Sequence, residues 1–182
     1  MSDFSDKELL EKFRNADTQH YAFNLIMRKY QQKVYYHIRR MLIDHDDTND
    51  VVQNTFIKAW NGLSNFREDS QLFTWLYRVA TNEALSFINQ RKKTQKISME
   101  ESDEKILNQL HADKSVNANQ LELKLQVAIS KLPEQQRAVF NMRYYDEIKY
   151  EDMSKILGVT AGALKASYHH AVKKIEKFIT DN

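Results

Sequence analysis

The chain is predicted to fold as an all-α protein of two small helical domains joined by a flexible linker. Its 182 residues include only three glycines and one proline, too few for the turns of an all-β fold. Apolar residues recur at helical spacing over most of the chain. Large apolar side chains become scarce only over residues 94–119. We therefore expect an N-terminal domain at 1–93, a linker at 94–119 and a C-terminal domain at 120–182.

The N-terminal domain is expected to contain four helices. The first follows a capping box formed by Ser5 and Glu8. The second spans 19–42 and carries a solvated cationic face of Arg28, Lys29, Lys33, Arg39 and Arg40. The acidic stretch 44–50 should end it and cap a third helix at 50–60, which Gly62 closes in the left-handed conformation. After a loop at 63–69, a fourth helix runs over 70–93.

The linker is too long and too polar for a loop inside a compact domain, although a short helix is expected near 106–110. In the C-terminal domain, one helix starts near Gln120 and the next has Pro133 at its first position. Two further helices follow, separated by Gly158.

The segment 150–169 has the features of a helix-turn-helix. Gly158 suits a turn with positive φ, and Thr160 suits the start of the second helix. Apolar contacts from Ile156, Leu157, Val159 and Leu164 should lock the two helices together.

That second helix concentrates positive charge, with four lysines against one glutamate over 165–177 in a chain of net charge +2. The charge alone fits a solvated amphipathic helix. The turn, the cap and the charge together favour a helix that neutralises phosphates and enters the major groove. The expected DNA-contacting residues are Thr160, Lys165, Ser167, His169, His170, Lys173 and Lys174.

A second informative string is DVVQNTFIKAW at 50–60. Its apolar residues explain packing, but Gln53, Asn54 and Lys58 point away from the core on a helical projection. A polar face of this kind suits docking of a partner helix.

Three strings together are specific: DVVQNTFIKAW at 50–60, NFREDSQLFTWLYRVATNEALSFINQRKK at 65–93, and KLPEQQRAVFNMRYYDEIKYEDMSKILGVTAGALKASYHHAVKK at 131–174. In this order and spacing the chain resembles bacterial RNA polymerase sigma factors of the sigma-70 family. Its length and layout resemble the extracytoplasmic-function (ECF) group. The resemblance implies a transcription initiation factor whose partners are core RNA polymerase (the β and β′ subunits), promoter DNA and an anti-sigma factor.

The resemblance also implies roles for particular segments. The helix at 50–60 resembles the surface that binds the coiled coil of the polymerase β′ subunit, through Asp50, Gln53, Asn54, Ile57 and Lys58. The loop at 65–71 and the next helix resemble the unit that opens DNA at the downstream (minus ten) element, through Phe66, Arg67, Arg78, Asn82, Arg91 and Lys92. Phe66 could either stack on a flipped base or pack in the core, and the sequence leaves both roles open. Trp75 is expected to pack in the core. The helix from Thr160 resembles the one that enters the major groove at the upstream (minus thirty-five) element, and the linker resembles the segment that runs towards the polymerase active site.

Two departures from the family pattern stand out. Many members carry an acidic residue where this chain has Asn54. Many also carry arginines on the recognition helix where this chain has Ser167, His170 and Val172. Because arginine makes the commonest specific contact to guanine, recognition of the upstream element should be weaker or altered. The neighbouring His169 and His170 could add charge below about pH 6.5, the ordinary histidine value.

The sequence gives little indication that the protein is an enzyme. Without cysteine there is no disulfide, thiolate zinc site or cysteine nucleophile, and none of the six histidines forms HExxH. We expect no catalytic residue, no metal and no cofactor. No apolar run reaches about 18 residues, so no membrane insertion is expected. The acidic N-terminus is unlike a secretory signal, which favours the cytoplasm.

Two alternatives stay open on sequence alone. One is a stand-alone helix-turn-helix regulator, which would bind an operator as a dimer without polymerase. The other is a purely structural helical adaptor, whose association with DNA, if any, would not depend on salt.

Overall fold

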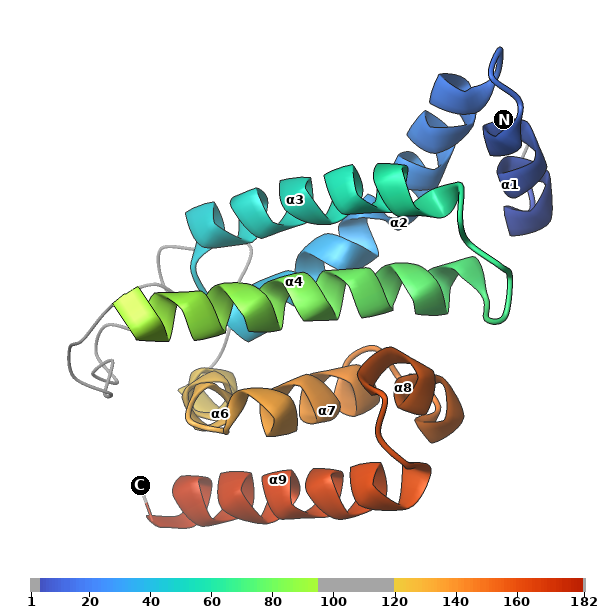
Figure 1. The fold of residues 1–182 in the computed structure, drawn as a ribbon. Helices are drawn as coiled ribbons and strands as arrows, with labels where there is room; N and C mark the ends of the chain where they lie inside the picture. Colours follow the sequence, from blue (N-terminus) through green and yellow to red (C-terminus); the bar gives the residue numbers. More distant parts are fainter. Residues whose placement is uncertain (1–3, 95–119, 182) are drawn as a thin grey trace.

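The computed structural model describes residues 4–94 and 120–181. These residues form helices and no strands, which confirms the all-α prediction (Figure 1). The helices are α1 (Asp6–Arg14), α2 (Gln19–Leu42), α3 (His45–Leu63), α4 (Leu72–Thr94), α6 (Gln120–Ser130), α7 (Glu134–Tyr144), α8 (Tyr150–Leu157) and α9 (Ala161–Asp181). The expected linker and the short helix near 106–110 lie outside the described residues, apart from Thr94 at the end of α4.

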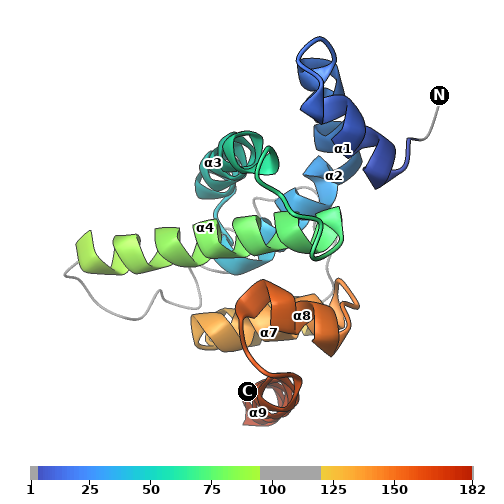
Figure 2. The ribbon, with the colours of Figure 1, turned by 45° about the vertical axis from the view of Figure 1, so that its right-hand side comes forward.

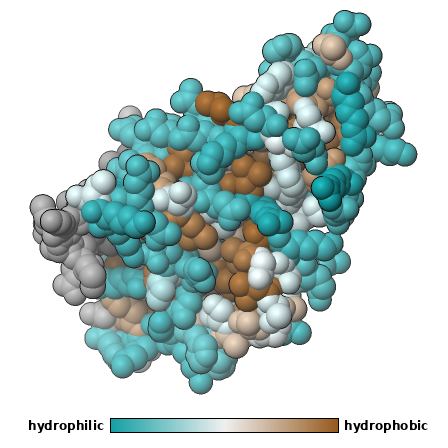
Figure 3. Space-filling model, viewed as in Figure 1, coloured by the Kyte–Doolittle hydropathy of each residue, from teal (hydrophilic) through white to brown (hydrophobic). Residues whose placement is uncertain are grey.

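The helices are stacked so that α4 separates α3 from the C-terminal helices. In Figures 1 and 2, α7 and α8 lie directly beneath α4, and α9 lies beyond them on the far side. The α3 surface and the α9 surface therefore face opposite sides of the molecule. Hydrophilic residues dominate the face seen in Figure 3, and hydrophobic residues show mainly along the seams between helices.

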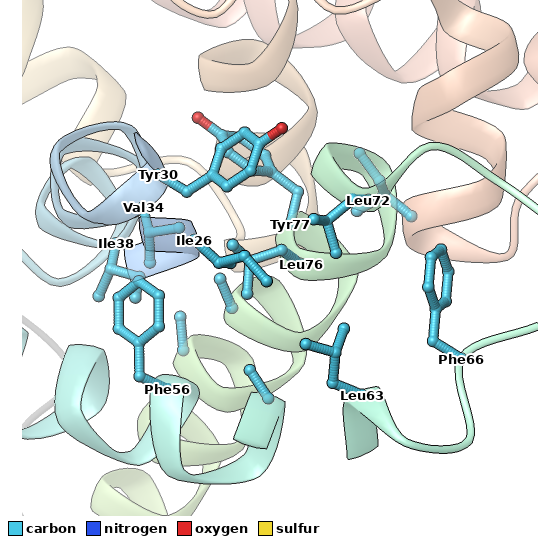
Figure 4. Close-up of a cluster of buried hydrophobic side chains, with 14 of the residues drawn as sticks. Ile26, Tyr30, Val34, Ile38, Phe56, Leu63, Phe66, Leu72, Leu76 and Tyr77 are labelled. Carbon is cyan, nitrogen blue, oxygen red and sulfur yellow. The ribbon is translucent and has the colours of Figure 1, made fainter. Parts of the chain in front are cut away.

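Helix α2 is the central element of the N-terminal domain, and its bounds are those that the sequence predicts. It packs against α1, α3 and α4. Figure 4 shows the resulting core, in which Ile26, Val34 and Ile38 of α2 meet Phe56 of α3 and Leu76 of α4. All five side chains are at most 5% exposed, so their burial supplies a large part of the hydrophobic stabilisation of this domain.

Local sequence signals explain where two of these helices begin. The Ser5 side chain accepts a hydrogen bond from the Glu8 backbone, and the Glu8 carboxylate accepts one from the Ser5 backbone, which confirms the capping box. At α3, the Asp44 carboxylate accepts hydrogen bonds from the backbone N–H groups of Asp46 and Asp47. The acidic stretch therefore forms the first turn of α3, and the prediction that this helix begins only at Asp50 is wrong.

The prediction that Gly62 closes α3 in the left-handed conformation is also wrong. Gly62 lies within α3, which continues to Leu63. A Cβ atom at Gly62 would lie 3.1 Å from Cζ2 of Trp75. A side chain at this position would press against the Trp75 indole, which approaches the α3 backbone closely. The following helix α4 begins at Leu72, two residues later than predicted.

The two domains share one hydrophobic core. Met142, Ile148, Met153 and Ile156 of the C-terminal domain belong to the same cluster as the buried residues of α1–α4. A smaller cluster joins Ile43, which follows α2, to Val127 of α6. The described parts of the two domains therefore form a single packed body.

This packing changes the cationic face expected on α2. Arg39 is only 9% exposed, and the Arg40 guanidinium donates a 2.7 Å hydrogen bond to the Asp146 carboxylate in the other domain. Both residues lie at the end of α2 that meets the C-terminal domain. The prediction that they are solvated is wrong, because helical periodicity within one element does not show which faces a second domain covers.

Candidate polymerase and nucleic-acid interfaces

Helix α3 presents one continuous exposed face. Its opposite side is buried through Val51, Thr55, Phe56 and Ala59. The exposure predicted from the sequence for Gln53, Asn54 and Lys58 is confirmed, and Asp50 and Ile57 are exposed on the same side. They recur at the three- and four-residue spacing that places side chains along one helical stripe.

Ile57 is unusual on this stripe because it is a large apolar side chain that is 53% exposed. Nearby, the Lys58 ammonium lies 2.5 Å from the Glu83 carboxylate of α4, which ties the stripe to the neighbouring helix. An apolar side chain surrounded by amides and charges on a rigid helix is suited to contact with a second helix.

The loop between α3 and α4 places Phe66 and Arg67 differently. Phe66 is 8% exposed, and its ring centroid lies 5.3 Å from that of Trp75. In Figure 4 the Phe66 ring lies at the edge of the hydrophobic cluster. Arg67 is exposed on the same loop. To stack on a nucleic-acid base, Phe66 would have to leave its contact with Trp75, so its proposed role stays a prediction.

Helix α4 carries the remaining candidates for the downstream element. Arg78 and Asn82 are both exposed and lie one helical turn apart on one face. Arg91 donates a 2.5 Å hydrogen bond to Asp47 of α3. Lys92 forms an ion pair with Glu134, the first residue of α7. Of these four, Arg78 and Asn82 present their side chains outwards, whereas Arg91 and Lys92 are held by carboxylates.

The helix-turn-helix has the local geometry that the sequence predicts. Gly158 adopts a left-handed conformation with φ of 69° and closes α8. The Ala163 backbone donates a 3.3 Å hydrogen bond to the Thr160 hydroxyl, which caps α9. Ile156 and Leu164 are buried at the junction. Val159 is 38% exposed, so the prediction that it helps lock the two helices is wrong. Its carbonyl instead accepts a hydrogen bond from the Ser154 hydroxyl.

Helix α9 buries Leu164, Ala171 and Ile175 and turns its cationic side outwards. The exposed residues on that side include Lys165, His169, His170, Lys173 and Lys174, while Ser167 is half-buried. Lys165, His169 and Lys173 follow one another at four-residue spacing and form one line along the helix. The Lys174 ammonium donates a hydrogen bond to Gln136 of α7, so one of its donors is already used within the C-terminal domain.

Sequence reasoning missed one candidate surface residue, Tyr144. This side chain is 51% exposed and stacks on Phe140, whose ring in turn stacks on Tyr168 of α9. The pair Tyr144-Tyr145 at the end of a predicted helix was visible in the sequence. The stack also includes Tyr168 of α9, which contacts Phe140 from 28 residues away, and periodicity does not reveal such contacts.

The contacts between the domains were also missed. Arg40 and Asp146 are separated by 106 residues, and no local pattern links them. Within the described segments, no group of three or more His, Asp or Glu side chains is placed to hold a metal ion. The helices traced in this structure include none with the length and apolar character needed to cross a bilayer.

Comparison with known protein families gives two matches. Residues 26–94 match the model described as sigma-70 region 2, and residues 122–175 match sigma-70 region 4. The first segment contains α3 and α4, and the second contains the helix-turn-helix. Every candidate residue on α3, α4 and α9 falls inside a matched segment.

Curated relatives match over nearly the whole chain. The RNA polymerase sigma-H factor of Pseudomonas aeruginosa is 30% identical over 180 residues, covering 94% of this chain and 92% of the relative. The ECF RNA polymerase sigma-E factor of Haemophilus influenzae is 30% identical over 183 residues, covering 96% of this chain and 95% of the relative.

Two solved structures share the fold. One shows CnrH in complex with the cytosolic domain of CnrY, with a TM-score of 0.71, 20% identity, and coverage of 97% of this chain and 98% of that chain. The other shows the sigma factor RpoE of Bartonella quintana in complex with the anti-sigma factor NepR, with a TM-score of 0.67, 19% identity, and coverage of 87% and 96%.

Proposed function

This chain belongs to the ECF group of the sigma-70 family of RNA polymerase sigma factors, and from that premise we propose which of its surfaces bind core polymerase and promoter DNA. As a transcription initiation factor, it directs polymerase to promoters. The observation that carries the proposal is that both family matches coincide, in chain order, with an exposed docking face on α3 and an exposed cationic face on α9. A stand-alone regulator would account for α9 but not for the α3 face.

The α3 stripe of Asp50, Gln53, Asn54, Ile57 and Lys58 is proposed to bind the β′ coiled coil. A helix-on-helix contact gains most from an apolar residue that loses its water on binding, and Ile57 is the large apolar residue of this stripe. The Gln53 and Asn54 amides beside it can form hydrogen bonds at the rim of the interface. Because amides are uncharged, these contacts avoid the cost of removing water from a charge. Asn54 makes the stripe less acidic than in many family members.

The α4 face is proposed to hold the opened strand of the downstream element. Extruding a base costs a few kcal/mol of stacking and pairing, which contacts to the freed strand must offset. Arg78 can contact phosphates or bases, and Asn82 can form hydrogen bonds with base edges from the same helical face. Arg67, Arg91 and Lys92 would add positive charge near the same strand, and Phe66 is the candidate stacking residue.

The outward side of α9 is proposed to enter the major groove at the upstream element. The line of Lys165, His169 and Lys173 is suited to phosphates and to hydrogen bonds with base edges. Thr160, Ser167, His170 and Lys174 flank this line. Because lysine contacts phosphate as a point charge and arginine alone offers a planar fork to guanine, affinity here should depend on charge more than on sequence.

We also infer regulation by an anti-sigma factor. The two structures with this fold were determined with CnrY and with NepR bound, and the family resemblance implies such a partner. Sigma factors are non-enzymatic, and we infer that this chain contributes binding while the polymerase performs the chemistry. Because core polymerase and promoter DNA are its proposed partners, we propose that it acts in the cytoplasm.

Binding to core polymerase tests the proposed role of α3. Ile57→Asp places a charge on the docking stripe and should weaken association with core enzyme at least tenfold in a fluorescence titration. Leu121→Asp is a matched control, because Leu121 is 61% exposed on α6 in the other domain. Its affinity should stay within about twofold of the parent. Equal affinities for both variants and the parent would remove α3 from the proposal.

A further inference from the structure

Helix α1 contacts the end of α3 and the loop after it through two consecutive residues. Phe13 is 1% exposed, and its ring centroid lies 5.3 Å from that of Trp60, near the end of α3. The Arg14 guanidinium donates a 2.7 Å hydrogen bond to the Glu68 carboxylate in the loop that joins α3 to α4. In Figures 1 and 2 this loop runs beside α1. The first helix thus supports the loop that is proposed to act on the downstream element.

Helix α1 is firmly anchored, which makes it a suitable support. Leu9 and Leu10 are at most 4% exposed and belong to the core of the N-terminal domain. The capping box at Ser5 fixes the first turn. Arg14 is the last residue of α1, where the helix dipole favours a positive charge. The backbone of Arg14 is therefore held in place, and its side chain extends to the loop.

The loop has an unusual backbone at the residue that Arg14 holds. Glu68 has φ of 59°, in the left-handed region that residues with a side chain rarely adopt. Such a conformation persists only where surrounding contacts hold it, and the pair with Arg14 is one of these contacts. Because the Arg14 and Glu68 side chains are 48% and 41% exposed, the pair adds little to the stability of the whole protein. Its effect is therefore on the shape of the loop.

The loop residue proposed to approach the opened strand, Arg67, lies between two held neighbours. On one side Phe66 is buried against Trp75, and on the other side Glu68 is paired with Arg14. Arg67 itself is exposed. When both neighbours are fixed, the Arg67 backbone loses less freedom on binding, so more of its interaction energy is available for affinity and selectivity. The pair also neutralises a carboxylate that would otherwise repel phosphates.

We propose that Arg14 is a positioning residue for the downstream element: it holds Glu68 and thereby fixes the loop so that Arg67 meets the opened strand in one orientation. The inference rests on the proposed function of this loop. Arg14 and the rest of α1 precede residues 26–94, the segment that matches sigma-70 region 2, so that match assigns them no role.

The shape of the loop can be tested in the free protein with a spin label. The chain has no cysteine, and Asp69 is an exposed loop residue, so Asp69→Cys provides a single site for a nitroxide. Arg14→Gln and Glu68→Gln should each make the nitroxide more mobile in its electron paramagnetic resonance spectrum. Lys7→Gln is the matched control, because it removes an exposed positive charge from the same helix, and its spectrum should match that of the parent.

The consequence for DNA is tested with the complex of core polymerase and this protein. The readout is selectivity, the ratio of affinities for the preferred downstream element and for the same DNA with one base changed. General attraction between charges and phosphates cancels in this ratio. Arg14→Gln and Glu68→Gln should each lower the ratio about threefold, in keeping with the modest strength of an exposed ion pair. Affinity for core enzyme should stay within about twofold.

Two further variants separate positioning from direct contact with DNA. If Arg14 acts through Arg67, Arg14→Gln should cause no further loss of selectivity in a chain that already carries Arg67→Ala. Exchanging the charges, with Arg14→Glu and Glu68→Arg together, should recover at least half of the lost selectivity and restore the parent spectrum of the nitroxide. A loss with Arg14→Gln but none with Glu68→Gln would instead mean that Arg14 contacts DNA itself, which overturns the proposal.

The two measurements also separate this proposal from the proposed function. Unchanged nitroxide mobility in both Arg14→Gln and Glu68→Gln would show that the pair does not hold the loop, whatever the DNA result. If the parent shows no selectivity for a downstream element, or Arg67→Ala leaves selectivity unchanged, the proposed role of the loop is wrong. The proposal for Arg14 is then overturned with it, although the spectra still report whether Arg14 fixes the loop.

Discussion

Two chemically identical substitutions, four residues apart, should change stability in opposite directions. Gly158→Ala and Gly162→Ala each add one methyl group, and neither new Cβ would meet another atom within 4 Å. Packing is therefore the same in both cases. The backbone differs, because Gly158 has φ of 69° in the helix-turn-helix turn and Gly162 lies in the first turn of α9.

The expected magnitudes follow from backbone conformation. An alanine in the left-handed region costs roughly 1–2 kcal/mol, of which about 0.5–1 kcal/mol is returned because alanine restricts the unfolded chain. Gly158→Ala should therefore destabilise by up to about 1.5 kcal/mol. Gly162→Ala should stabilise by about 0.5–1 kcal/mol, because alanine is the better helix former.

Urea unfolding monitored by far-UV circular dichroism measures both free energies, provided that a second probe such as tryptophan fluorescence gives the same transition. Gly162→Ala is the control for Gly158→Ala, and the difference between them should be about 0.5–2.5 kcal/mol by the same estimates. If both variants shift the midpoint in the same direction, the left-handed turn at Gly158 is not the structural requirement inferred for it.

Three further predictions concern charge and protonation. Lys173→Ala should reduce the slope of log affinity against log salt for upstream-element DNA by about one, since each phosphate contact contributes about 0.9; an unchanged slope means that Lys173 does not contact phosphate. Burial raises the pKa of four tyrosines above the ordinary 10.0, namely Tyr30, Tyr77, Tyr145 and Tyr168. The unfolded chain therefore loses these protons first, and the urea midpoint should fall as pH rises above about 10; a constant midpoint up to pH 11 would contradict this. Hydrogen bonds from Ser5 lower the pKa of the Glu8 carboxyl below 4.5, so Ser5→Ala should raise it in an NMR titration, and no change would argue against the capping box.

Local signals predicted the parts of the structure that depend on neighbouring residues. The capping box at Ser5, the bounds of α2 and the left-handed turn at Gly158 follow from hydrogen bonding and backbone preference within a few residues. The outward face of α3 and the cationic side of α9 follow from helical periodicity. Exposure of these faces is confirmed, whereas the roles of their individual residues stay predictions.

The features that the sequence did not predict depend on contacts between residues that are far apart in the chain. Gly62 looked like a helix terminator, but it lies inside α3, next to Trp75, which is thirteen residues later in the chain. Arg40 looked solvated, but a carboxylate 106 residues away binds it. Phe66 was ambiguous because an aromatic residue in a loop suits both a core and a base, and only the contact with Trp75 shows where it lies in the free protein.

Promoter-directed initiation tests the central claim most directly. Core RNA polymerase is incubated with a promoter library, with and without this protein, and run-off transcripts are counted. The account predicts transcripts from a defined subset of promoters only when the protein is present, and a strong loss with Ile57→Asp. Transcription that does not change when the protein is added, or specific binding to duplex DNA by the free protein as tight as in the presence of core enzyme, would contradict it.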